Sequence, residues 1–224
     1  HYMMGGVRVD ADTAATSVSG LFAAGEVAAG LHGANRLGGN SLSDLLVFGR
    51  RAGQYAAEYA RSRAGLPSVN PEEVEYAAHT MLSPFESGGG ENPFSVHLDL
   101  QKSMQALVGI IRTESELRQA LDEIAGLKQR LERVSVPGNR QYNSAWHQAL
   151  DLEFMLTVSE AITLAAIERK ESRGGHTRDD YPAADAALAR VNVVTRRSNG
   201  EITSAFEPLA DMPEELKQII EDKS

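Results

Sequence analysis

A polar, glycine-rich loop leads directly into an apolar helical pattern at residues 32–53, HGANRLGGNSLSDLLVFGRRAG. A helix with Asn40 or Ser41 as its N-cap would direct unpaired backbone amides and a partial positive charge toward an anion. Arg36 adds a planar fork that fits a carboxylate, and the two glycines before the helix let backbone approach a bulky ligand closely. The pattern indicates an anion-binding site, although an interdomain salt bridge or a carbonyl clamp would also use Arg36.

Two other polar side chains could take part in ligand binding. Glu26 closes the segment GLFAAGE, where its carboxylate could accept hydrogen bonds from a ribose or polyol, or could simply be a solvated turn residue. His1, in HYMMGG, offers a ring donor, and His32 opens the loop described above, but a single histidine is equally typical of a structural role. The remaining histidines have no metal-ligand spacing, so we expect no metal site.

Charged residues concentrate in ERKESRGGHTRDDYP, at the end of a helical pattern. The cations are Arg169, Lys170, Arg173 and Arg178, and the acids are Glu171, Asp179 and Asp180. Cations in a last helical turn complement the helix dipole, so a solvated, capped helix end explains most of this segment. The alternative is a surface on which the N-terminal region docks.

Composition limits the function classes. The chain has 224 residues and a formal net charge of -9, which argues against nucleic-acid binding. It contains no cysteine, so disulfides, thiolate catalysis and cysteine-ligated clusters within this chain are excluded. The apolar runs fall far short of the roughly 20 residues that span a bilayer.

The hydrophobic periodicity predicts a mixture of short strands and longer helices. The first thirty residues alternate like strands, with Val7–Val9 and 21–24 as the clearest segments, and residues 40–63 predict a helix with one buried face. A second helix begins at Asn70–Pro71 and fades by Leu82.

After a turn-rich loop at residues 83–95, three amphipathic patterns predict an antiparallel helical bundle. Thr113 and Glu116 form a capping box before the second of these helices. Two extended runs around Asn199 and Gly200 predict a terminal hairpin.

The motifs HYMMGG, GLFAAGE, HGANRLGGNSL and ESRGGHTRDDYP occur in the order found in one family. The chain resembles the flavoprotein subunit of succinate dehydrogenase and fumarate reductase, over nearly its whole length. The resemblance implies the C-terminal portion of that subunit, because no GxGxxG fingerprint is present. A chain of this length is therefore expected to be inactive on its own.

The resemblance also implies roles for particular residues. His1 and Arg36 match the family's histidine and arginine that bind the dicarboxylate substrate. Glu26, Ser41 and Leu42 match positions that contact FAD, and the catalytic residues of the family lie outside this chain. The polar N-terminal end of the helix would then face flavin and dicarboxylate, and the apolar remainder of the helix would pack against the sheet.

The implied fold is α+β: a remnant of an FAD-binding α/β domain in residues 1–84, a three-helix domain in 85–182, and a hairpin and tail in 183–224. The implied enzyme is an FAD-dependent oxidoreductase of electron transport and the tricarboxylic acid cycle, interconverting succinate and fumarate. It would pass electrons to an iron-sulfur subunit and lie on the cytoplasmic face of the cell membrane through an anchor subunit.

Two alternatives remain at this point. L-aspartate oxidase shares the histidine, the HGANR run and the ESRG helix end, but usually has RLASNSL where this chain has RLGGNSL. The second alternative belongs to a different functional class: the segment would be a non-catalytic interaction domain whose helical bundle docks an iron-sulfur partner.

Overall fold

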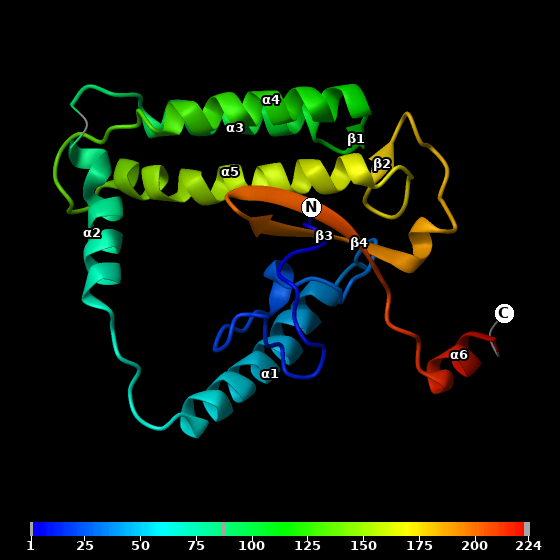
Figure 1. Cartoon of the computed structure of the whole chain (residues 1–224). Coiled ribbons are helices and arrows are strands. Elements are labelled where there is room, and N and C mark those ends of the chain that lie inside the picture. Colours follow the sequence, from blue (N-terminus) through cyan, green and yellow to red (C-terminus); the bar gives the residue numbers. More distant parts are fainter. Residues whose placement is uncertain (1, 87, 222–224) are drawn as a thin grey trace. The chain divides into compact units, whose positions relative to one another are not determined.

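The computed structural model describes residues 2–86 and 88–221, which form two compact units (Figure 1). The first unit contains residues 1–77 together with 173–175, and the second contains residues 78–172 and 176–224. Both helices and strands are present, which confirms the α+β prediction.

The N-terminal part of the first unit is extended but contains little regular strand. Residues 7–9 and 21–24 form isolated bridges, Val7 with Ala28 and Ala15 with Phe22, rather than the expected strands. A short 3-10 helix, η1 (Gly25–Val27), follows. The expected strands are absent because each segment pairs with a partner at a single position, which is too little to build a ladder.

Helix α1 (Asn40–Ser62) begins where the periodicity predicts, but two details of the prediction are wrong. Its N-cap is Gly39, at φ +83°, and no side chain caps the first turn. Glycine adopts this left-handed conformation without steric cost. The expected face is only partly buried: Phe48, Ala52 and Tyr59 are half-buried, Leu42 and Leu46 are exposed, and Asp44 is the one buried residue of the helix among those described.

Helix α2 (Pro71–Glu86) starts at the predicted Asn70–Pro71 pair, with the Asn70 side chain accepting from the Glu72 amide at 3.0 Å. It continues past Leu82 and through Pro84. The Trp146 indole donates to the Met81 carbonyl at 2.6 Å, and the Val136 amide donates to the Pro84 carbonyl at 2.8 Å. These tertiary contacts stabilise an extra turn that local sequence signals do not predict.

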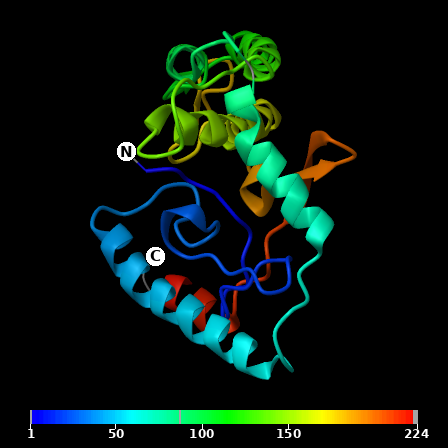
Figure 2. The same cartoon turned by 90° about the vertical axis from the view of Figure 1, so that its left-hand side faces the viewer.

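The second unit contains the predicted three-helix bundle, α3 (Pro93–Leu107), α4 (Glu114–Leu131) and α5 (Ser144–Glu168). Figure 2 views α3 and α4 nearly along their axes and shows them side by side. The core is aliphatic, and its largest fully buried members are Val96, Leu117, Ile124, Leu152 and Leu156. Thr113 and Glu116 make both hydrogen bonds of the predicted capping box.

The predicted hairpin consists of β3 (Val191–Ser198) and β4 (Glu201–Pro208), which pair in antiparallel register. Asn199 and Gly200 both have positive φ, as a two-residue hairpin turn requires. A 3-10 turn, η2 (Leu188–Arg190), precedes β3, and α6 (Glu214–Glu221) follows β4. Two short strands, β1 (Ile111–Arg112) and β2 (Thr177–Arg178), pair in parallel beside the bundle.

Two charged residues of the segment after α5 are buried, so the expectation of a solvated helix end is wrong for them, although Lys170, Asp179 and Asp180 are exposed. Glu171 and Arg178 are both 0% exposed. Arg178 holds Asp180 with two hydrogen bonds of 2.7 Å and donates to the Ala166 carbonyl of α5 at 2.8 Å. Asp180 also accepts from the Glu114 amide, at the start of α4, at 2.8 Å. The ion pair thus joins the C-terminal end of α5 to the N-terminal end of α4.

The Arg178–Asp180 pair makes the free energy of unfolding depend on pH under acidic conditions. Hydrogen bonds from Arg178 lower the pKa of Asp180 from 3.8 to about 2. A lowered pKa in the folded state stabilises the fold above the ordinary pKa, and this stabilisation is lost as the pH falls from about 4 to about 2. We expect Asp180→Asn to flatten the pH dependence of the urea midpoint in this window. The exposed Asp122→Asn is the control, and equal slopes for Asp180→Asn and the unaltered chain would contradict the prediction.

Candidate functional site

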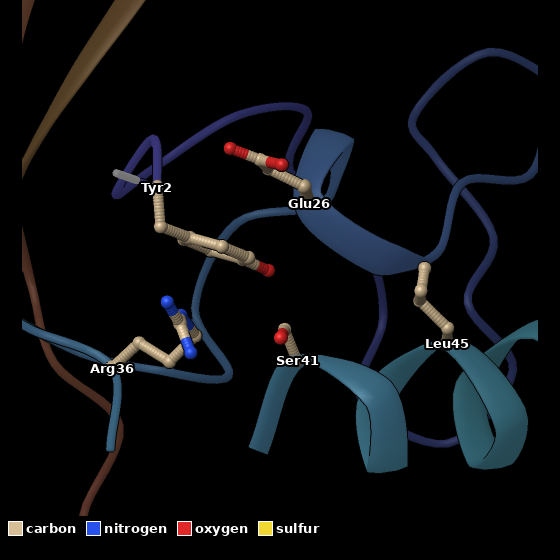
Figure 3. Close-up of a pocket in the computed structure, with 5 residues that line it drawn as sticks. All are labelled: Tyr2, Glu26, Arg36, Ser41 and Leu45. Atoms are coloured by element: carbon tan, nitrogen blue, oxygen red, sulfur yellow. The ribbon is translucent and has the colours of Figure 1, made fainter. Parts of the chain in front are cut away.

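A pocket of about 220 Å³ lies in the first unit, at the beginning of α1 (Figure 3). Its lining residues are Tyr2, Glu26, Arg36, Ser41 and Leu45. The Tyr2 ring lies between the Glu26 carboxylate and the Arg36 guanidinium, and Ser41 faces the same space from the first turn of α1 (Figure 3). The fold therefore brings together three of the side chains that the sequence singled out.

Glu26 is positioned by the short helix η1. Its Oε1 accepts a hydrogen bond from the Met3 amide at 2.8 Å, which fixes the carboxylate against the N-terminal segment. A carboxylate has capacity for further hydrogen bonds beyond this one. Glu26 can therefore also accept from hydroxyl groups of a ligand.

Arg36 makes no ion pair within residues 2–86 and 88–221, and its Nε is buried without a hydrogen-bond partner there. The guanidinium carbon lies 4.7 Å from the centre of the Tyr2 ring. Neither the salt bridge nor the carbonyl clamp that the sequence left open is present among these residues. A buried donor without a partner is costly, and a carboxylate would satisfy this guanidinium through two hydrogen bonds.

The beginning of α1 offers backbone donors on another side of the pocket. Gly39 provides no side-chain cap, and the Asn40 and Leu42 amides donate to the Leu37 and Gly39 carbonyls at 3.2 and 3.3 Å. Among the described residues the Ser41 amide has no such partner and is left for water or a ligand. Ser41 lines the pocket, whereas the Leu42 side chain is 68% exposed and is not part of the lining. Leu45, one turn further along, supplies the apolar wall.

His1 lies outside the described residues. His32 is present near the site, with its Nε2 3.3 Å from Asp44 Oδ2. Tyr2, Asp44 and Leu45 were missed by the sequence analysis. Asp44 had a detectable signal, since it is an acid placed among the apolar positions of a helix; Tyr2 had only its position next to a candidate histidine.

The loop that carries Arg36 is supported from behind by residues 173–175. The Gly175 amide donates to the Ala34 carbonyl at 2.8 Å. Gly174 has φ +59°, and a Cβ at this position would lie 2.8 Å from the Ala34 Cβ and closer still to its carbonyl. Only glycine permits this approach.

The Gly174 contact predicts a destabilising substitution. We expect Gly174→Ala to lower the unfolding free energy by about 3 kcal/mol, because overpacking adds to left-handed backbone strain. Gly175→Ala is a matched control, since its Cβ would lie 3.6 Å from the Ala34 carbonyl oxygen. Gly200→Ala, at φ +86° in open space, measures the backbone strain alone. Equal urea midpoints for Gly174→Ala and Gly200→Ala would show that the Ala34 contact is unimportant.

A candidate metal site is absent from the described residues. Within residues 2–86 and 88–221, no cluster of three or more histidine, aspartate or glutamate residues has the arrangement to hold a metal ion. In the same part of the chain, no helix combines the length and apolar character needed to span a bilayer.

Comparison with models of known protein families shows to which family this chain belongs. A model described as fumarate reductase flavoprotein C-term matches residues 97–219. The chain belongs to this family. The match confirms the resemblance seen in the motifs. An FAD-binding domain model matches residues 1–42, which include the pocket loop and identify FAD as the cofactor.

Individual members of the fumarate reductase flavoprotein family match most of this chain. The fumarate reductase flavoprotein subunit of Haemophilus influenzae is 41% identical over 83% of this chain and 31% of its own length. The succinate dehydrogenase flavoprotein subunit of Coxiella burnetii is 37% identical over 84% of this chain and 34% of its own. The chain thus spans about a third of the length of these relatives.

Solved structures of the family share the fold. Mycobacterium smegmatis Sdh1 in complex with UQ1 superposes with a TM-score of 0.94 at 50% identity, over 99% of this chain and 38% of that one. The FrdA chain of Escherichia coli quinol fumarate reductase gives a TM-score of 0.83 at 32% identity, over 95% and 38%. The α+β arrangement is therefore that of succinate dehydrogenase and fumarate reductase flavoproteins.

Proposed function

We propose that this chain forms the substrate-facing and helical parts of an FAD-dependent flavoprotein subunit that interconverts succinate and fumarate. The observation that carries the proposal is the half-buried Arg36, whose Nε is buried without a partner among the described residues, in a pocket that Glu26 and the first turn of α1 also line. A cation with free donors fits a dicarboxylate. A carboxylate and the unpaired Ser41 amide at the start of α1 suit the hydroxyl and polar ring groups of a flavin nucleotide.

The residues of this chain would bind and orient rather than react. Arg36 would hold one carboxylate of the substrate, and His1 is proposed for the other carboxylate. Fixing both ends aligns the central carbons for transfer, which is where positioning contributes to the rate. FAD, when bound, supplies the hydride chemistry.

The cofactor contacts would come from Glu26 and from the backbone at Ser41 and Leu42. Glu26 would accept from the sugar-like hydroxyls of FAD, as its fixed carboxylate permits. The N-terminal turn of α1 would stabilise negative charge near it, because its amides carry the positive end of the helix dipole.

The relatives are described as flavoprotein subunits, which supports a proposal on partners and location. We propose an iron-sulfur subunit as the electron partner and an anchor subunit as the indirect link to the inner face of the cell membrane. Residues 85–182 would be the helical domain that meets the iron-sulfur subunit, between the FAD-binding part in 1–84 and the tail in 183–224.

The test is a substrate comparison in a full-length flavoprotein that contains this segment. We expect succinate to reduce an artificial dye through the enzyme, and L-aspartate to give no turnover. Oxidation of L-aspartate in preference to succinate would replace the proposal by an aspartate oxidase. Absence of turnover with either diacid, in protein loaded with FAD, would refute it.

A further inference from the structure

Asp44 is an unusual residue to bury, and its surroundings explain its place. It is 5% exposed on a helix whose apolar residues are largely exposed. A buried carboxylate is costly unless polar groups converge on it. Here the Tyr2 hydroxyl donates to Oδ2 at 3.3 Å, and His32 Nε2 lies 3.3 Å from the same oxygen.

Tyr2 connects this carboxylate to the pocket. Its ring edge packs against His32, with the ring centres 5.2 Å apart and the planes at 86°. Its face carries the Arg36 guanidinium at 4.7 Å, and Figure 3 shows the ring extended over that group. Desolvation, together with the Asp44 charge, raises the pKa of Tyr2 above its ordinary value, so the hydroxyl remains a donor.

The ring contact matters because Arg36 has no other anchor among the described residues. Its Nε is buried and unpartnered, and no carboxylate or carbonyl holds its fork. An aromatic face attracts a guanidinium without occupying its N–H donors. The Tyr2 face can therefore fix the direction of Arg36 and leave its donors free for a ligand.

We infer that Tyr2 and Asp44 are positioning residues for the carboxylate-binding Arg36: Asp44 fixes Tyr2, and the Tyr2 ring holds the guanidinium at the pocket. The inference rests on the proposed function of Arg36. When a long, flexible side chain is already held in its binding conformation, less conformational entropy is lost as the ligand binds.

The test uses a full-length flavoprotein containing this segment, loaded with FAD, and malonate as the dicarboxylate probe in calorimetry. Tyr2→Leu removes the ring and should raise the malonate Kd and the succinate KM about tenfold, equivalent to about 1.4 kcal/mol, with kcat little changed. Tyr2→Phe keeps the ring but loses the hydroxyl that Asp44 holds, so it should weaken binding several-fold, as Asp44→Ala does, and less than Tyr2→Leu. Asp44→Ala should weaken binding several-fold, and Asp44→Asn, whose amide oxygen still accepts from Tyr2, should recover it.

Two controls separate positioning from general damage. Asp12→Ala removes an exposed carboxylate that pairs with Arg51 and should leave the malonate Kd unchanged. In an Arg36→Ala background, Tyr2→Leu should lose its effect, because residues that act through one group are not additive. FAD content and melting temperature are measured for every variant, and Asp44→Ala serves as the test if Tyr2→Leu does not fold.

The outcomes distinguish the inference from the proposed function. If Arg36→Ala leaves the malonate Kd unchanged, both are overturned. If Arg36→Ala weakens binding while folded Tyr2→Leu or Asp44→Ala does not, only the inference is overturned. A Tyr2→Phe variant as weak as Tyr2→Leu, or a full Tyr2→Leu effect without Arg36, would also overturn it.

Discussion

Arg36→Ala is expected to lower kcat/KM for succinate by about 1,000-fold, or about 4 kcal/mol, in a full-length flavoprotein containing this segment. The substitution removes both N–H donors that would pair a substrate carboxylate. A misaligned diacid also loses the positioning that contributes to the rate. Steady-state kinetics with succinate, and malonate binding by calorimetry, measure the two parts of the effect.

Two matched variants make the Arg36 result specific. Arg36→Lys keeps the charge but not the planar fork, so we expect an intermediate loss. Arg51→Ala removes an arginine of α1 that pairs with the exposed Asp12. It should change kcat/KM less than twofold, because such surface ion pairs contribute little. Equal losses for Arg36→Ala and Arg51→Ala would indicate general damage to α1 instead of lost substrate binding.

Arg178→Ala is expected to lower the unfolding free energy by about 3–5 kcal/mol. The substitution leaves Asp180 without the guanidinium that makes two hydrogen bonds to it, and it removes the donor to the Ala166 carbonyl at the end of α5. Urea unfolding followed by circular dichroism measures the change.

The control for Arg178 is an exposed arginine of the same unit. Arg196 is 67% exposed in its side chain and pairs with Glu207 across the hairpin. Arg196→Ala should cost less than about 1 kcal/mol, because Arg196 is itself exposed to water, where an ion pair contributes little, whereas Arg178 is fully buried. A loss of comparable size in the two variants would contradict the importance of burial at Arg178.

The helical bundle and the hairpin were predictable because their signals are local. The capping box at Thr113 and Glu116 acts within a few residues. The apolar stripe of α4 is equally local, and its residues Ile124 and Leu127 form part of the core. Asn199–Gly200 likewise fixes its own turn. Where a distant contact intervened, as with Trp146 on Met81, the prediction of the α2 end failed.

The candidate site was predictable only in part. Arg36, Glu26 and Ser41 have residue types that indicate ligand chemistry, and their motifs gave the family. Tyr2 has no such signal, and Asp44 has only its place among the apolar positions of a helix, because an aromatic ring or a carboxylate gains its role from what it contacts. No pattern along the chain predicts that a tyrosine near the N-terminus will carry an arginine on its face.

The sequence by itself determined the family, the helical bundle, the hairpin and the chemical types available at the pocket, since these follow from motifs and short-range periodicity. Tertiary structure alone decided that Arg178 and Glu171 are buried, that Asp44 is the buried residue of α1, and that Gly174 must lack a side chain. Burial and close approach depend on segments far apart in the chain, and the free energy of a charge or a glycine depends on those neighbours.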